Sequence, residues 1–205
     1  MSEFRLVSGV KVPDLGGVHE AFDIRRGEKL SVFYINISAE NIERVLRCFI
    51  NQLEEPCFFV YEVPVNKATE ETLQEAGTAS RHGDVYYWDG LSRQNLQELI
   101  DEYGELWIND GLVKFGFATH HDSRDELYIT KYKIGILYTM DEQRYIDLLR
   151  EMGIPQEEQI KTVWNNITQD KPGEASVITV SGKSIYDVLE ELIPQGLYFA
   201  ERREQ

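Results

Sequence analysis

The stretch from Leu30 to Leu53 constrains the fold more than any other part of the chain. Its first half, LSVFYINI, is rich in β-branched and aromatic residues, which favour a β-strand. Ser38 follows, and serine is a preferred N-cap of helices. The next apolar residues have the spacing of one helix face: Ile42, Val45, Leu46, Phe49, Ile50 and Leu53. The pattern predicts a strand, a short turn and a helix.

Similar patterns continue along the chain. The nearly continuous apolar run Cys57–Val63 predicts a central strand that is buried on both faces. Further strands are predicted at residues 85–88, 112–119, 127–139, 176–180 and 197–200. Further helices are predicted after Ser92, Thr139, Gly153 and Ser184. The polar residues HHDSRDE, between the strands predicted at 112–119 and 127–139, indicate a hairpin.

This element order predicts an α+β fold. An unbroken alternation of strands and helices would favour a parallel sheet, but the hairpin interrupts it. We therefore expect a mixed sheet with several strand–turn–helix units, a central β-hairpin and helices packed on the sheet. The chain of 205 residues fits a single α+β domain, 1–205. A division into two lobes, 1–65 and 84–205, stays open, because residues 66–83 are polar like a linker.

The net charge of −15 limits the partners that the chain can bind. Such a field repels nucleic-acid phosphates and anionic lipids, and it attracts basic proteins. The first residues show no secretory signal, and no apolar run reaches the length of a membrane span. We therefore expect a cytoplasmic protein with a basic protein partner and with neither nucleic acid nor membrane as a partner. The oligomeric state stays open.

One predicted helix carries a stripe of acidic residues. Glu98, Asp101, Glu102 and Glu105 follow the i, i+3, i+4, i+7 spacing of one face, and Asp110 comes shortly after them. A surface of this kind can bind a basic partner. The alternative interpretation is an ordinary solvated helix face.

A second candidate site is the predicted hairpin loop. It contains His120, His121, Asp122, Asp125 and Glu126, whose imidazole and carboxylate groups suit zinc, manganese or iron. These residues are the basis of an alternative function, a metal-dependent hydrolase. The competing interpretation is a solvated loop, since charged residues gather in loops.

The sequence contains no complete motif for catalysis or for a cofactor. The turn SGKS lies between a predicted strand and a helix, as in a phosphate-binding loop, but Val177 occupies the place of the first glycine of that motif. Cys57 begins an apolar strand, where cysteine usually acts as a small buried hydrophobe. We therefore predict no catalytic residue and no cofactor, and favour a non-catalytic protein.

In size, acidity and lack of a catalytic motif, the chain resembles bacterial immunity and antitoxin proteins. Those proteins neutralise basic toxin domains. The resemblance lies in composition and assigns no individual residue. It implies an acidic inhibitor that associates rapidly with a basic toxin domain and covers its site.

Overall fold

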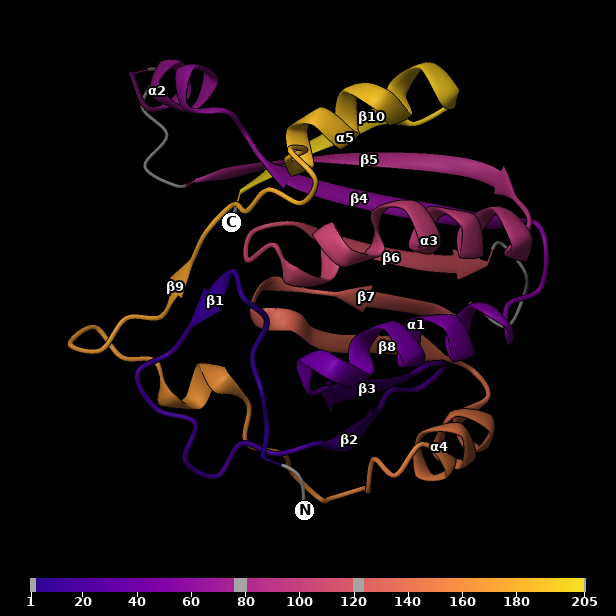
Figure 1. Cartoon of the computed structure of the whole chain (residues 1–205). Helices are drawn as coiled ribbons and strands as arrows, with labels where there is room; N and C mark the ends of the chain where they lie inside the picture. The colour runs from indigo at the N-terminus through magenta and orange to yellow at the C-terminus, as the bar shows by residue number, and fades with distance from the viewer. Residues whose placement is uncertain (1–2, 76–80, 120–123, 205) are drawn as a thin grey trace.

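The computed structural model describes residues 3–75, 81–119 and 124–204 (Figure 1). Within these residues eight strands form one sheet in the order β10-β5-β4-β6-β7-β8-β3-β2. The strands are β2 (Ala21–Arg26), β3 (Ser31–Asn36), β4 (Cys57–Pro64), β5 (His82–Leu91), β6 (Lys114–Thr119), β7 (Glu126–Ile129), β8 (Ile134–Thr139) and β10 (Tyr198–Glu204). The α+β class is confirmed, while all neighbouring strands of this sheet are antiparallel rather than mixed.

The predicted strand–turn–helix units are present, but they join strands that are not neighbours. β3 leads through α1 (Ile42–Ile50) to β4, and β8, β7 and β6 lie between those two strands. β5 leads through α3 (Arg93–Asn109) to β6, with β4 between them. An odd number of strands fills each gap, so the two ends of a unit run the same way in an antiparallel sheet. α2 (Lys67–Glu75) lies in the predicted linker, which joins the neighbouring strands β4 and β5.

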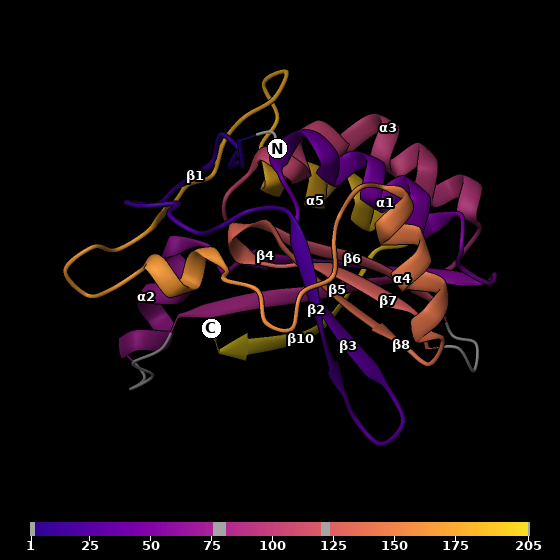
Figure 2. The same ribbon diagram turned by 90° about the horizontal axis from the view of Figure 1, so that it is seen from below.

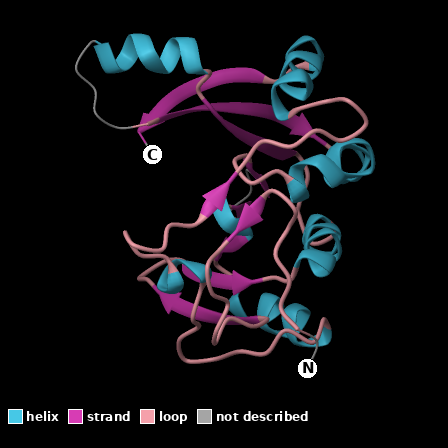
Figure 3. Ribbon diagram, turned by 60° about the vertical axis from the view of Figure 1, so that its left-hand side comes forward, coloured by secondary structure: helices cyan, strands magenta, loops and turns pink. Residues whose placement is uncertain are grey.

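One face of the sheet carries the helices. Figure 2 shows α1, α3 and α5 (Ile185–Leu192) along this face, with α4 (Glu142–Glu151) beside α1, and Figure 3 shows helices in a row along one side of the strands. α1 buries the apolar stripe that its sequence predicts, and Phe49 of this helix contacts Tyr145 of α4 at 5.6 Å between ring centroids. Ser92 caps α3 by accepting a hydrogen bond from the backbone N–H of Asn95. None of the described helices is both long and apolar enough to cross a membrane.

The centre of the core is an aromatic cluster between α3 and the sheet. Trp107 of α3 is fully buried, and its ring centroid lies 4.9 Å from that of Phe59 and 5.5 Å from that of Phe115. Tyr61 and Tyr103 also contact the indole. Truncating a side chain in such a position typically costs about 3–5 kcal/mol, so this cluster holds the helices on the sheet.

The strand predicted at 127–139 is wrong: the structure divides it into β7 and β8. A short 3-10 turn, Lys131–Lys133, separates the two strands and lets them pair with each other. Tyr132 and Lys133 adopt left-handed backbone conformations, with φ of 62° and 59°. Non-glycine residues seldom adopt this conformation, so the sequence carried no turn signal.

The helix predicted after Gly153 is also wrong. Only the 3-10 turn Val163–Asn166 forms there. The residues before it follow the edge strand β2: Phe22 donates its N–H to the carbonyl of Pro155, and Glu157 donates its N–H to the carbonyl of Phe22. These contacts with β2 replace the hydrogen bonds that a helix would make.

The strand predicted at 176–180 is wrong as well. The structure instead pairs the two residues β9 (Glu174–Ala175) with β1 (Val10–Lys11), in a small separate sheet. Beyond this pair, Ser176 exchanges backbone hydrogen bonds with Gly9 and Gly111. The segment therefore joins the N-terminal region to the end of α3.

Candidate functional site

The predicted acidic stripe lies on the outer side of α3. Glu98, Asp101, Glu102 and Glu105 are all exposed there. α5 lies beside α3 (Figure 1) and adds further carboxylates to this surface. We call the combined set the α3/α5 acidic surface: Glu98, Asp101, Glu102, Glu105, Asp187, Glu190 and Glu191.

Few basic groups balance these carboxylates. Arg93 is the sole basic residue within α3 and α5, both of which the structure describes completely. Asp101 pairs with Arg47 of α1 at 2.7 Å, and Glu191 pairs with Lys183 at 2.7 Å. Glu98, Glu102 and Glu105 form no ion pair with any described residue. The surface therefore keeps a net negative field.

Two side chains connect the acidic groups of the two helices. The Tyr103 hydroxyl donates to Glu191 at 3.2 Å. Burial raises the pKa of Tyr103, and the neighbouring carboxylates of Glu102 and Glu191 raise it further, so the hydroxyl stays protonated. The hydrogen bond to Glu191 likewise raises the pKa of Lys183. The acidic field thus runs continuously from α3 to α5.

Asp110, which follows the stripe and is predicted to bind the partner with it, does not belong to this surface. Its side chain is fully buried. One carboxylate oxygen accepts from the N–H groups of Leu112 (2.8 Å) and Val113 (2.9 Å), and the other accepts from the N–H of Ile178 (2.9 Å). These bonds satisfy backbone donors after the end of α3, so Asp110 fixes a turn and is not available to a partner.

The structure describes only part of the predicted metal loop. His120, His121 and Asp122 lie outside the described residues. Asp125 is fully buried, forms an ion pair with Arg144 of α4, and accepts from the Thr139 hydroxyl at 2.6 Å. Glu126 is half-buried on the sheet face opposite the helices, and burial raises its pKa. Asp125 already has a structural role.

The described residues show no assembled metal centre. No group of three or more His, Cys, Asp or Glu among them is arranged to hold a metal ion. Cys57 is buried, and burial raises the pKa of its thiol to about 11, so the thiol stays protonated at neutral pH. The hydroxyl and lysine of the SGKS turn are engaged as well: Ser184 caps α5, and Lys183 pairs with Glu191.

A second surface, which no sequence pattern predicts, is the sheet face opposite the helices. Paired residues form one row across all eight described strands of the large sheet: Asp23, Tyr34, Ile136, Tyr128, Gly116, Val60, Tyr87 and Tyr198. Four of these eight residues are tyrosines, so this face of the sheet is rich in tyrosine.

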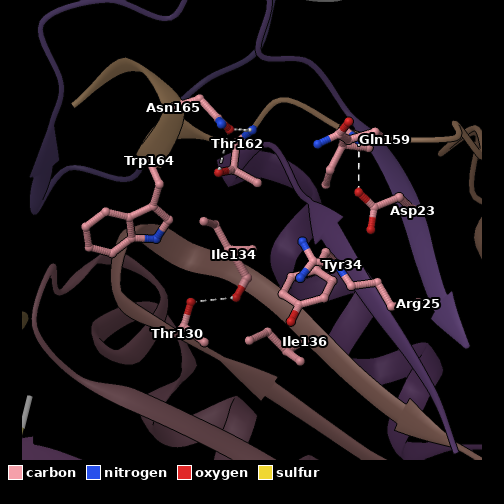
Figure 4. A pocket seen from close by; sticks show the side chains of 11 residues that line it. Asp23, Arg25, Tyr34, Thr130, Ile134, Ile136, Gln159, Thr162, Trp164 and Asn165 are labelled. Carbon is pink, nitrogen blue, oxygen red and sulfur yellow. Dashed lines mark hydrogen bonds between the residues drawn. The ribbon is translucent and has the colours of Figure 1, made fainter. Parts of the chain in front are cut away.

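At the β2 end of this face lies a pocket of about 270 Å³. Strands β2, β3 and β8 form its floor, and residues 159–165 form its wall. Figure 4 shows Asp23 and Trp164 at opposite ends, with Ile134 between them. Asp23 is 4% exposed, whereas Trp164 is 48% exposed. The pocket thus combines a buried carboxylate, an apolar floor and an accessible indole.

The pocket could not be predicted because β2 and the Trp164 segment were not assigned. Asp23 lies on the unpredicted strand, and Trp164 lies in the segment for which the sequence predicts a helix. The alternation of AFDIRR between apolar and polar residues was the one available signal for β2.

Comparisons with protein-family models, with curated proteins and with solved structures found no match to this chain.

Proposed function

We propose that this chain is a non-catalytic interaction protein that binds a basic protein through the α3/α5 acidic surface. The target would be a basic toxin domain, as for immunity and antitoxin proteins, and the encounter would take place in the cytoplasm. The observation that carries the proposal is the charge of two adjacent helices: four carboxylates on α3 and three on α5, both described completely, against Arg93.

The physical basis is electrostatic steering. A surface of one sign raises the rate at which an oppositely charged protein arrives in the correct orientation. Rigid helices hold these carboxylates, because Trp107 and its aromatic neighbours fix α3 on the sheet. A preorganised surface loses little conformational entropy on binding. The acidic helices therefore suit rapid capture of a basic partner.

The test is affinity capture from the source lysate with three forms of the chain. The first is the native chain, and the second carries Glu98→Gln, Glu102→Gln and Glu105→Gln. These three carboxylates are exposed and form no ion pair with a described residue, so their loss should not unfold α3. We expect a basic protein to be captured by the native chain at low salt and to be lost from the triple variant.

The third form is a control with the same change in charge at another place. It carries Asp147→Asn, Glu151→Gln and Glu158→Gln, three exposed residues in and after α4. Figure 1 shows α4 at the other end of the row of helices from α5. Capture by the control and not by the triple variant would assign the partner to the α3/α5 acidic surface. Equal capture by all three forms would contradict the proposal.

A further inference from the structure

The pocket below residues 159–165 contains a buried acceptor without a donor. Asp23 Oδ2 accepts from the backbone N–H of Ile160 at 3.0 Å, which fixes the carboxylate. Asp23 Oδ1 is buried and accepts no hydrogen bond from any residue that the structure describes. A buried acceptor of this kind is costly to leave unsatisfied, and a buried carboxylate is more costly still. The site therefore favours a ligand that brings a positively charged donor.

Two basic residues that are close in sequence to Asp23 or Ile160, Arg25 and Lys161, have other contacts. Arg25 lies two residues further along β2 and stacks on Tyr34, with its guanidinium carbon 4.2 Å from the ring centroid. Lys161 donates to the carbonyl of Gly16 at 2.7 Å. Neither forms an ion pair with Asp23 in the described structure. Arg25 is exposed and lines the same pocket as Asp23, so its side chain can move without disturbing the core.

The remaining walls of the pocket suit an arginine side chain. Ile134 and Ile136 form an apolar strip that can cover the three methylenes of such a side chain. At the far end, Trp164 is held edge-to-face by Tyr132 at 4.6 Å between ring centroids. The exposed indole can contact the peptide that carries the arginine. A planar guanidinium also stacks on tyrosine, as Arg25 does on Tyr34.

We propose that this pocket binds the guanidinium group of an arginine, with Asp23 as its acceptor, Ile134 and Ile136 beneath its stem, and Trp164 at the mouth. The arginine belongs either to a peptide segment of a partner protein or to a free small molecule. The site lies on the sheet face opposite α3 and α5, so it does not depend on the proposed function.

The test titrates the isolated native chain with N-acetyl-L-arginine amide and follows the indole N–H signals by NMR. The chain has three tryptophans, and a Trp164→Phe variant assigns the relevant signal. We expect a saturable shift of the Trp164 signal with a dissociation constant of about 1–10 mM, the order that one charged side chain supports. N-acetyl-L-citrulline amide, a neutral molecule of the same shape, should give no saturable shift.

Free L-arginine distinguishes the two sources of the ligand. Binding of L-arginine at least about tenfold tighter than the amide would assign the pocket to a small molecule, and the reverse order would assign it to a peptide. Equal binding of the arginine and citrulline compounds, or no saturable shift at about 50 mM, would overturn the proposal. Solvent would then satisfy Asp23.

Variants check the placement of the guanidinium. Asp23→Asn keeps an acceptor for Ile160 and puts an amide N–H at the place of the unpaired oxygen, so we expect at least about tenfold weaker binding. Arg25→Gln removes a like charge next to the site and should strengthen binding a few-fold; weaker binding would contradict the placement. If Asp23→Asn does not fold, Trp164→Leu serves instead, since Trp164 is exposed. Because this variant has no indole at the site, its binding is followed by the backbone amide signals of Ile134 and Ile136. The binding should be weaker, and unchanged affinity would overturn the proposal.

Replacing Glu98, Glu102 and Glu105 by glutamine should leave arginine binding unchanged. These residues lie on the helix side of the sheet, away from the pocket. Failure of the proposed function in the capture experiment therefore leaves this result untouched, and the two proposals can fail separately.

Discussion

The ammonium group of Lys133 lies inside the protein, next to the end of α3. Its Nζ donates to the carbonyl oxygens of Trp107 (2.8 Å) and Val113 (3.0 Å). Carbonyls in the last turn of a helix lack partners within the helix, so Lys133 satisfies a group that needs a donor. Burial lowers the pKa of Lys133 to about 7, and the charge of Asp110 partly opposes this shift.

This buried lysine predicts how stability depends on pH. Above pH 7 the folded chain loses the Lys133 proton, whereas the unfolded chain keeps it up to about pH 10.4. The unfolded state then binds more protons, so the free energy of unfolding rises with pH. From pH 7 to 8.5 we expect the Lys133 side chain to add about 1–2 kcal/mol to the free energy of unfolding of the native chain. The Lys133→Met variant should not show this increase. Urea unfolding at both pH values measures it, and equal pH dependence of the two proteins would disprove it.

Asp125 supports a second prediction at the residue scale. Replacing it by Asn removes the buried charge that pairs with Arg144, while the side chain of Arg144 stays 27% exposed and keeps Asp141 at 3.8 Å. We expect the free energy of unfolding to fall by about 2–3 kcal/mol, which is less than the loss expected when one partner of a completely buried ion pair is removed. Glu126→Gln, the matched control, should cost less than about 1 kcal/mol, because burial already favours its neutral form.

The same variants test the metal-dependent hydrolase. If Asp125 and Glu126 held a metal ion, added zinc would raise the melting temperature of the native chain and not that of either variant. Because Asp125 already pairs with Arg144, we expect zinc to leave the melting temperature of all three proteins unchanged. A zinc-dependent rise in the native chain alone would restore the hydrolase as the better hypothesis.

At the scale of elements, local sequence predicted most of the helices. The stripes of α1, α4 and α5 repeat at helical spacing, and Ser92 and Ser184 cap the helices that follow them. For such elements the local pattern and the tertiary environment agree. The same agreement holds for β4, whose continuous apolar sequence matches a strand inside the sheet.

Elements whose form depends on distant residues could not be predicted in this way. β2 mixes Asp23, Arg25 and Arg26 with apolar residues, and its pairing with β3 is what makes it a strand. The turn at Tyr132 and Lys133 requires left-handed backbone at two residues without a glycine. The exposed α3 stripe was predictable from helical spacing, whereas the pocket joins Asp23 to a segment more than a hundred residues away.

The contact between α3 and α5 provides a prediction for an element. Lys183→Gln removes the cation that pairs with Glu191, and it leaves Tyr103 as a donor to the same carboxylate. Because this pair is partly exposed, the stability should change by less than about 1 kcal/mol. The negative potential of the α3/α5 acidic surface should increase, so association with a basic partner should become faster at low salt. Slower association, measured by stopped flow, would be inconsistent with steering by this surface.

At the scale of the whole molecule, the two faces of the sheet differ in chemistry. The helix side carries the α3/α5 acidic surface, and the opposite side carries a row of paired residues, rich in tyrosine, that ends at Asp23. Protein interfaces are enriched in tyrosine, and acidic surfaces increase the rate of encounter with basic proteins. The two proposals therefore assign electrostatic capture to one surface and side-chain recognition to the other.

The most direct test of the central claim measures the association rate constant with the captured basic protein between about 50 and 500 mM salt. The account predicts a steep fall with salt for the native chain and for the Asp147, Glu151 and Glu158 control. The Glu98, Glu102 and Glu105 variant should start at least about tenfold slower at low salt and depend less on salt. Equal rates and equal salt dependence for native chain and variant would contradict binding through α3 and α5.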